Sequence, residues 1–550
     1  MKTNVSLCIA AALMVAACGD PSHRHNSGEK VSVINSTPDE VTPDEVIEED
    51  VEITSNEAAL MEPSANATSK MILSSPPQQR NAETYKEIKE NSFVAVAQQP
   101  VTTFSADVDR AAYANVRRII GYGQIPPKDA VRIEEMVNYF DYDYPAPEEG
   151  SASPLRVSPE LAPAPWNPNH LLLRIGLQAK KIDLAQAPPS NIVFLIDVSG
   201  SMDEENKLPL LQSSFKLLLG QLRPDDKIAI VTYANGTKVA LPSTSVKDKE
   251  KIIKVLDNLY ASGGTSGGKG IQLAYEQAQK SFIKNGNNRI ILATDGDFNI
   301  GINNTTDLEK FIEKQRESGI YMSVLGFGIG NYRDDMAETI ADKGNGNYAY
   351  IDNITEAKKV LVNELSGTLF AVAKDVKLQL EFNPKYVKEY KLIGYENRML
   401  ANEDFTNDKK DAGEIGAGHT VTALYELVPS DGKVAQSLRY QSQELNEKGK
   451  GNELGFLKIR YKDPKVKDAK SVEITEPLVF NKKALKETST DYRFAASVAE
   501  FGILLRDNSN KANATYDQVI ELAEGAIGKD PEGYRKEFVR LVKSVKMLPK

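Results

Sequence analysis

NIVFLIDVSGS, residues 191–201, runs from a continuous apolar segment directly into a loop that carries one carboxylate and two hydroxyls. The unbroken apolar run predicts a strand buried on both faces, because a half-exposed strand would alternate polar and apolar residues. Asp197, Ser199 and Ser201 emerge together where this strand ends. Oxygen-bearing side chains grouped in this way predict a site for a metal ion.

Two later segments supply further oxygen donors beside small residues. GGTSGG, residues 263–268, places Thr265 among glycines, and the apolar run RIILAT, residues 289–294, is followed at once by Asp295. The combined set contains neither sulfur nor imidazole, and its hard oxygen atoms favour Mg²⁺ or Mn²⁺ over zinc or copper. We therefore predict a divalent cation site formed by Asp197, Ser199, Ser201, Thr265 and Asp295.

Strand and helix patterns alternate from residue 191 to about residue 373. Strands are predicted at 192–196, 227–233, 238–241, 289–294, 321–327 and 348–351. Helices are predicted at 207–222, 247–260, 268–282, 307–318, 334–343 and 356–370. This alternation predicts an α/β fold: a doubly wound, Rossmann-like parallel sheet between layers of helices. Ligands of such sheets bind at the carboxyl ends of the strands near the switch in strand order, where Asp197 and Asp295 fall.

The flanking segments have other patterns. Helical spacing and a strand-like run at 171–177, after the proline-rich segment 159–168, indicate a small α+β unit before the α/β domain. Short alternating segments between residues 376 and 480 are typical of a β-sandwich, and three amphipathic helices follow from residue 492. We expect strand 171–177 to pair with the later strands, which would make the α/β domain an insertion in the sandwich. The predicted division is a signal peptide (1–17), an acidic tether (18–84), an N-terminal α+β domain (85–188), the α/β domain (189–373), a β-sandwich-like domain (374–485) and a C-terminal helical region (486–550).

The first residues predict an exported, lipid-anchored protein. Lys2 precedes a short apolar stretch, and Val-Ala-Ala-Cys closes that stretch at Cys18, an ending that resembles a bacterial lipobox. The resemblance implies that Cys18 carries the lipid anchor, while a general signal peptide remains the alternative. The tether repeats TPDEV at 37–41 and 42–46 and has no hydrophobic period, so we expect it to be disordered. The glycine after Cys18 favours the outer over the inner membrane, with periplasmic or surface display open.

Composition and look-alike motifs exclude several functions. A net charge of −10 and no basic stripe argue against nucleic-acid binding. Residues 263–270 nearly match a phosphate-binding loop, but Gly270 replaces the required hydroxyl and a helix precedes the loop, so nucleotide binding is not expected. Asp107 or Asp109 is interpreted as a helix N-cap, rather than the two as a phosphatase pair. His419, in a glycine-rich turn, is interpreted as structural.

The five oxygen donors resemble the metal-ion-dependent adhesion site of von Willebrand factor A-type (VWA) domains, over residues 190–373. The resemblance implies that Ser199, Ser201 and Thr265 ligate the ion directly and that Asp197 and Asp295 act directly or through water. It also implies that a carboxylate of a partner fills the remaining position. The segments 103–109, 126–136, 392–398 and 411–419 are similar to a bacterial family of lipoproteins that carries this domain at its centre.

These features together predict an envelope-anchored module that uses a divalent cation for metal-dependent protein–protein interaction or adhesion. We expect no enzyme activity, because hydrolysis needs a base beside the metal and the sequence offers only Asp203 or Asp297 and no histidine there. Two alternatives stay open: a metal-stabilised structural scaffold of envelope assembly, and a metal-dependent hydrolase.

Overall fold

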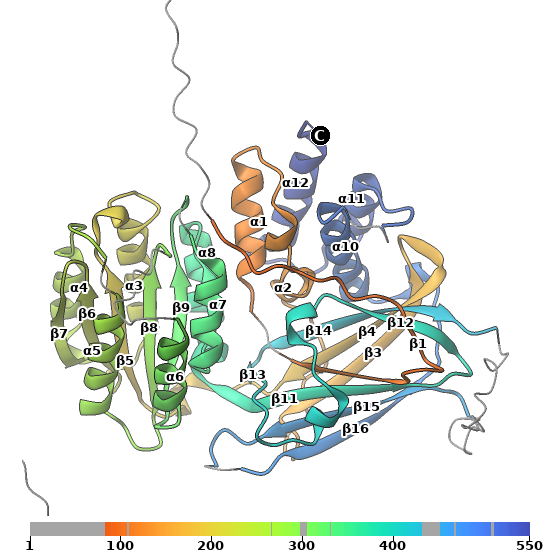
Figure 1. Cartoon of the computed structure of the whole chain (residues 1–550), viewed down its shortest axis with the longest axis horizontal. Helices are drawn as coiled ribbons and strands as arrows, with labels where there is room; N and C mark the ends of the chain where they lie inside the picture. The colour runs from red at the N-terminus through yellow and green to blue at the C-terminus, as the bar shows by residue number, and fades with distance from the viewer. Residues whose placement is uncertain are drawn as a thin grey trace, which may run out of the picture. The chain divides into compact units, whose positions relative to one another are not determined.

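The computed structural model describes residues 83–106, 109–265, 267–296, 305–330, 332–431, 451–466, 469–507 and 511–549. The predicted signal peptide, Cys18 and nearly all of the tether lie outside these residues. The described part of the chain folds into a six-stranded α/β sheet covered by helices and a pair of facing β-sheets with further helices (Figure 1).

The α/β sheet has the strand order β10-β9-β8-β5-β6-β7. Its strands are β5 (Ser190–Asp197), β6 (Lys227–Tyr233), β7 (Thr237–Ser245), β8 (Asn287–Thr294), β9 (Ile320–Gly326) and β10 (Tyr348–Tyr350). All pairs are parallel except the edge pair β6–β7, which is antiparallel. The chain moves outward from β5 in both directions, so the switch in strand order lies between β5 and β8. The predicted α/β, doubly wound fold is confirmed, with an antiparallel edge strand that the periodicity did not reveal.

Both faces of this sheet are covered by helices (Figure 1). Val193 and Leu195 pack in one core with α5, α6 and α7, whereas Ile192, Phe194 and Ile196 pack in another with α3, α4, α8 and α9. The helices are α3 (Leu208–Gln221), α4 (Lys249–Asp257), α5 (Gly267–Lys280), α6 (Thr305–Arg316), α7 (Asp334–Lys343), α8 (Ile354–Lys358) and α9 (Leu365–Leu369). The helix predicted at 356–370 is divided, because a π-helical turn at Lys359–Asn363 separates α8 from α9.

Two antiparallel sheets form the β-sandwich. One has the order β1-β12-β14-β4-β3 and comprises β1 (Val94–Ala95), β12 (Val387–Ile393), β14 (Thr420–Pro429), β4 (Asn167–Ala179) and β3 (Leu155–Ala164). The other has the order β13-β11-β15-β16, with β2 also paired to β11, and comprises β13 (Gly413–Gly416), β11 (Ala371–Phe382), β15 (Glu453–Lys462), β16 (Val472–Val479) and β2 (Val101–Ser105).

The pairing of β4 with β14 confirms the predicted insertion. The register aligns Leu171 with Leu427 and Thr420 with Gln178, so a strand that precedes the α/β domain lies beside one that follows it. The inner faces of both sheets share one hydrophobic core, to which residues on both sides of the insertion contribute. The domain boundaries at residues 188 and 373 remain predictions.

The proline-rich segment 159–168 forms part of a β-hairpin. Pro159 and Pro163 lie within β3, and the second strand of this hairpin already begins at Asn167. Proline has no backbone N–H to donate, so it is tolerated in an edge strand, which has a neighbouring strand on one side only. Strand β3 is the edge strand of its sheet. Trp166, in the connecting turn, is fully buried among the helices.

A helical layer packs on the outer face of the sheet that contains β4 and β14. It comprises α1 (Ala111–Gly121), α2 (Ile133–Asn138), α10 (Thr490–Leu505), α11 (Tyr516–Glu524) and α12 (Tyr534–Met547). Its core includes Leu172 of β4 and Leu424 of β14, so the C-terminal helices cover the preceding sheet as expected. None of the described helices is long and apolar enough to cross a membrane.

Candidate metal centre and its surroundings

Asp197 is the last residue of β5, and its side chain is fully buried. Its Oδ1 accepts a hydrogen bond of 2.9 Å from the backbone N–H of Ser199, which folds the loop back over the strand end. The hydroxyls of Ser199 and Ser201 lie 3.0 Å apart. Three of the five predicted donors are therefore held together by local structure alone.

The loop that carries Thr265 is hydrogen-bonded to the first loop. The N–H of Gly200 donates to the carbonyl of Gly263 at 2.8 Å, and the N–H of Ser262 donates to the carbonyl of Val198 at 2.8 Å. These bonds hold the half-buried Thr265 next to the serine loop. A Cβ on Gly200 would lie 3.3 Å from the Gly263 carbonyl, a tight contact that would require the backbone to move by a few tenths of an ångström.

Asp295 reaches the same edge of the sheet from the neighbouring strand β8. The register aligns Ile196 with Ala293, so the carboxyl ends of β5 and β8 lie side by side. Asp295 is buried, and its Oδ2 lies 3.4 Å from the ammonium of Lys207. The predicted neighbours Asp297 and Asn299 lie outside the described residues.

The electrostatics at Asp197 fit a bound cation. Burial raises the pKa of Asp197 to about 7, its hydrogen bonds with Ser199 oppose this rise, and the nearby charge of Asp295 adds to it. Within the described part of the chain, Asp197 Oδ2 is buried and has no hydrogen-bond partner within 3.5 Å, although the buried Tyr233 hydroxyl is close enough to lower the pKa of Asp197. A buried carboxylate oxygen without a donor carries a desolvation penalty that a metal ion would offset. The donor set therefore suits a hard divalent ion.

Lys207 is a member of this site that the sequence patterns did not reveal. Its ammonium donates to the Ser201 carbonyl at 2.8 Å and to Glu204 at 3.1 Å, in addition to its ion pair with Asp295. Gly328 packs on the lysine stem, because a Cβ there would lie 2.3 Å from the Cε atom of Lys207. One signal existed: Lys207 is the N-cap of α3, a position where the helix dipole disfavours a cation.

A cavity of about 360 Å³ opens beside the serine loop. Its lining mixes apolar and polar groups and includes Val198, Asn235, Lys238, Leu259, Tyr260 and Ser262. Tyr260, which contributes to this lining, is 72% exposed. Asn235 accepts a hydrogen bond from the N–H of Gly264, so one wall of the cavity is tied to the Thr265 loop.

The predicted helix caps are not found at Asp109. The N-cap of α1 is Arg110, without a side-chain cap. Instead, Glu135 of α2 accepts a hydrogen bond of 2.9 Å from the N–H of Ala112, and Asp109 accepts one from the N–H of Tyr348. The N-cap interpretation of Asp109 was therefore wrong, because a neighbouring helix supplies the acceptor. Asp107 lies outside the described residues.

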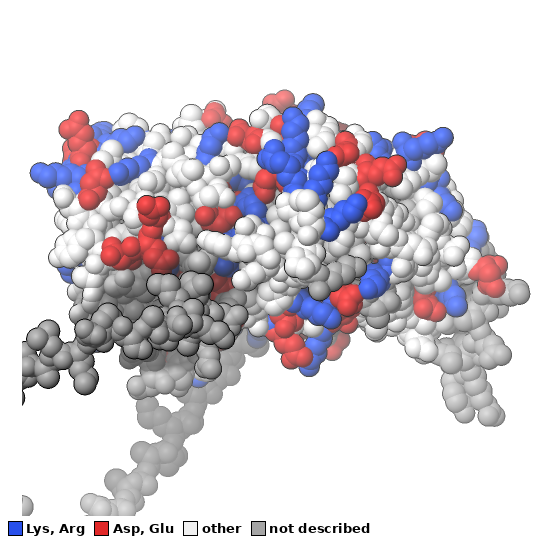
Figure 2. Space-filling view, turned by 90° about the horizontal axis from the view of Figure 1, so that it is seen from above, with Lys and Arg blue, Asp and Glu red and all other residues white. Residues whose placement is uncertain are grey.

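Basic and acidic side chains are interspersed on the face drawn in Figure 2.

Three segments match known protein families. Residues 79–174 match the family described as von Willebrand factor, residues 191–363 match the von Willebrand factor type A domain, and residues 367–548 match the C-terminal region of the uncharacterized protein YfbK. The five predicted donors all lie within the second of these segments.

Individual relatives extend the likeness over most of the chain. The uncharacterized protein YfbK of Escherichia coli is 48% identical over 465 residues, covering 83% of this chain and 80% of that protein. The uncharacterized protein sll0103 of Synechocystis is 26% identical, covering 59% and 74%. A solved von Willebrand factor type A structure from Catenulispora acidiphila is 15% identical with a TM-score of 0.40, covering 70% and 89%. The chain therefore belongs to a bacterial family, shared with YfbK, that combines a VWA domain with a distinct C-terminal region.

Proposed function

We propose that this protein is a binding module in which a divalent cation connects the VWA domain to an acidic side chain of a protein partner. VWA domains mediate protein–protein interactions and commonly bind a divalent metal. The observation that carries the proposal is the buried Asp197 carboxylate, which is grouped with the Ser199 and Ser201 hydroxyls and whose Oδ2 has no partner within 3.5 Å among the described residues.

Each donor has a distinct part in this proposal. The hydroxyls of Ser199, Ser201 and Thr265 bind the ion directly, and Asp197 and Asp295 bind it directly or through water. Neutral hydroxyls remove little of the ion's charge, so an Mg²⁺ or Mn²⁺ ion held in this way retains affinity for an outside carboxylate. The cavity beside the serine loop, with its exposed Tyr260, then accepts side chains next to the partner's acidic residue.

The surroundings favour binding over catalysis. His170 is bonded to Glu426 in the sandwich, and His419 is buried against Gly367 of α9. Asp203, one of the two candidate bases, has an exposed side chain on the serine loop. Neither described histidine lies beside the metal-binding loops to act as a general base, so we propose that the protein is not an enzyme.

We further propose that Cys18 carries a lipid that holds the protein in the bacterial envelope, with the outer membrane favoured by Gly19. The short apolar segment that ends in Val-Ala-Ala-Cys supports this. Replacing Cys18 by Ser is expected to abolish palmitate labelling and to release the protein from membrane fractions. Membrane retention of the unlabelled variant would contradict the anchor.

Metal binding and partner capture test the main proposal together. In calorimetric titrations with MnCl₂, we expect Asp197→Ala and Ser199→Ala each to lower the affinity for Mn²⁺ at least about tenfold. Asp203→Asn is the matched control, because it removes an exposed acid from the same loop. In whole envelopes, crosslinked partners should be captured by wild type and Asp203→Asn in Mg²⁺, and be lost in EDTA and in Asp197→Ala.

Two results would contradict the proposal. Unchanged capture in EDTA would exclude a metal connection to the partner. A fall in melting temperature for Ser199→Ala and Asp295→Ala, with an unchanged crosslinking pattern, would instead identify a structural scaffold that the metal only stabilises.

A further inference from the structure

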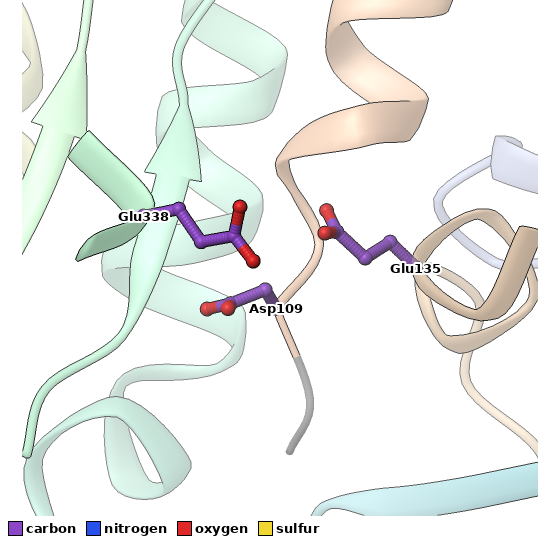
Figure 3. Close-up of side chains that lie close together, drawn as sticks. All are labelled: Asp109, Glu135 and Glu338. Atoms are coloured by element: carbon purple, nitrogen blue, oxygen red, sulfur yellow. The ribbon is translucent and has the colours of Figure 1, made fainter. Parts of the chain in front are cut away.

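A second group of carboxylates lies away from the VWA metal centre. Asp109 precedes α1, Glu135 belongs to α2 and Glu338 belongs to α7. One carboxylate oxygen from each lies within 4.8 Å of the others, and all three residues are at most 4% exposed. Figure 3 shows the carboxylates of Glu135 and Glu338 pointing toward each other from their two helices, with Asp109 beside them. We call these three residues the seam cluster.

Two arginines accompany the seam cluster. Arg398 donates to Asp109 at 2.6 Å and to Glu338 at 3.3 Å. Arg132 is bonded to Glu135 and donates to the fully buried Asp334 at 2.6 Å. Four buried carboxylates therefore lie around two guanidinium groups, and the charge of Lys86 also acts on Glu338. Carboxylates crowded together in a buried site repel one another and need close positive partners.

One atom of the seam cluster has an unused acceptor position. Glu338 is only 3% exposed, and its buried Oε2 has no hydrogen-bond partner among the described residues. Figure 3 shows that this carboxylate is directed toward Glu135. Burial raises the pKa of Glu135 to about 7, Arg132 opposes this rise, and the charge of Glu338 adds to it. The two glutamates thus repel each other across a space that faces an unsatisfied oxygen.

We propose that the seam cluster binds a divalent cation, with Ca²⁺ favoured over Mg²⁺. A dication would supply a partner for Glu338 Oε2 and offset the repulsion among carboxylates that lie within 4.8 Å of one another. Ca²⁺ accepts carboxylate oxygens in flexible geometry, whereas Mg²⁺ requires strict octahedral geometry and usually keeps several waters, which a buried cluster on three separate elements is less suited to provide. The ion would connect α7 of the VWA domain to the segment that starts α1 and to α2.

Calcium titration of a chain that lacks the VWA metal centre tests this site separately. In the Asp197→Ala background, calorimetry with CaCl₂ is expected to show one bound ion, and Ca²⁺ should raise the melting temperature relative to EDTA. Adding Glu338→Gln should weaken Ca²⁺ binding at least tenfold. Adding Asp342→Asn is the matched control, because Asp342 also pairs with Arg398 at 2.7 Å but is not part of the seam cluster, so Ca²⁺ binding should be retained.

Three outcomes would overturn the proposal. The first is the absence of Ca²⁺ binding in the Asp197→Ala background, and the second is equal affinity with and without Glu338→Gln. The third is a melting temperature that does not respond to Ca²⁺ and whose rise from pH 8 to pH 6 in EDTA is reduced by Glu338→Gln, which would show a shared proton in place of the ion. If Glu338→Gln fails to fold, Glu338→Asp replaces it, and the shortened side chain should again weaken Ca²⁺ binding.

Discussion

At the scale of single residues, Lys207 adds a positive charge to the proposed metal centre of the VWA domain. Its buried ammonium already pairs with Asp295, so it competes with an incoming cation for that carboxylate. Two unit charges 4 Å apart interact by about 4 kcal/mol at an effective dielectric constant of 20. With an ion bound, the lysine would add a positive charge near the open position. It should therefore weaken metal affinity while strengthening the attraction for a partner's carboxylate.

We predict that Lys207→Met raises the affinity for Mn²⁺ by about tenfold, equivalent to about 1.4 kcal/mol, because the competing cation is gone. Capture of an acidic partner should fall in the same variant. Calorimetry with MnCl₂ measures the first effect and envelope crosslinking the second. Lys216→Met, on the same helix but 39% exposed and paired with Asp257, is the control and should change neither. Weaker metal binding in Lys207→Met would show that the lysine supports the ligands instead.

The contrast between Asp197 and Lys207 shows what sequence can predict at this scale. Asp197, Ser199 and Ser201 could be recognised because their arrangement is local: a strand ends and the loop follows within five residues. The partner of Lys207 is 88 positions away, at Asp295, and only the folded sheet brings them together. Asp109 failed as a cap for the same reason, since Glu135 of another helix holds the first turn of α1.

At the scale of elements, helix α10 contains a buried acid that the amphipathic pattern did not indicate. Glu500 is fully buried, and neither carboxylate oxygen has a partner within 3.5 Å in the described structure, although the backbone N–H of Thr515 is close enough to oppose the rise in its pKa. Burial raises the pKa of Glu500 to about 8. A folded-state pKa above the unfolded value means that folding favours the protonated form. The contribution of Glu500 to the free energy of unfolding is therefore fully present below about pH 4.5. It is lost progressively as pH rises toward 8.

We predict that Glu500→Gln is more stable than wild type at pH 8.5 by up to a few kcal/mol and has a smaller advantage, or none, at pH 5. The reason is that glutamine needs no proton to remain neutral, and each unit of pKa shift corresponds to about 1.4 kcal/mol. Urea unfolding at both pH values measures the difference. Glu521→Gln, an exposed position on α11, should show no such dependence. An equal effect of Glu500→Gln at both pH values would mean that Glu500 does not take up a proton on folding.

Strand β3 shows why some elements escape prediction. Prolines at 159 and 163 argue locally against a strand, and only the tertiary fact that β3 is an edge removes the objection. In contrast, β5 and β8 were predictable because burial on both faces leaves an unbroken apolar run that can be read without knowing the neighbours.

At the scale of the whole molecule, the hydrophobic cores follow the insertion. Among the described residues, the two cores of the sandwich and its helical layer contain no residue between 181 and 369. The two cores of the α/β sheet receive only Ala111 and Ala114 from the flanking segments among their buried members. The contacts across this boundary are largely ionic, such as Arg117 with Asp352 and Arg132 with Asp334. If the α/β domain is removed, these arginines become exposed and hydrated. The sandwich should therefore tolerate the loss of their ion pairs.

The chain also leaves and re-enters the sandwich at adjacent points. The N–H of Gly418 donates to the carbonyl of Lys180, and the N–H of Ala417 donates to the carbonyl of Phe370. We predict that replacing residues 181–369 by a glycine–serine linker of about six residues, which reaches about 20 Å, leaves a folded sandwich. Circular dichroism and a cooperative urea transition measure this. Residues 371–549 alone are the control and should not fold, because β14 loses β4 and the helical core loses Trp166. If the linked chain unfolds without cooperativity or binds a hydrophobic dye, the VWA domain is an obligatory part of one folding unit.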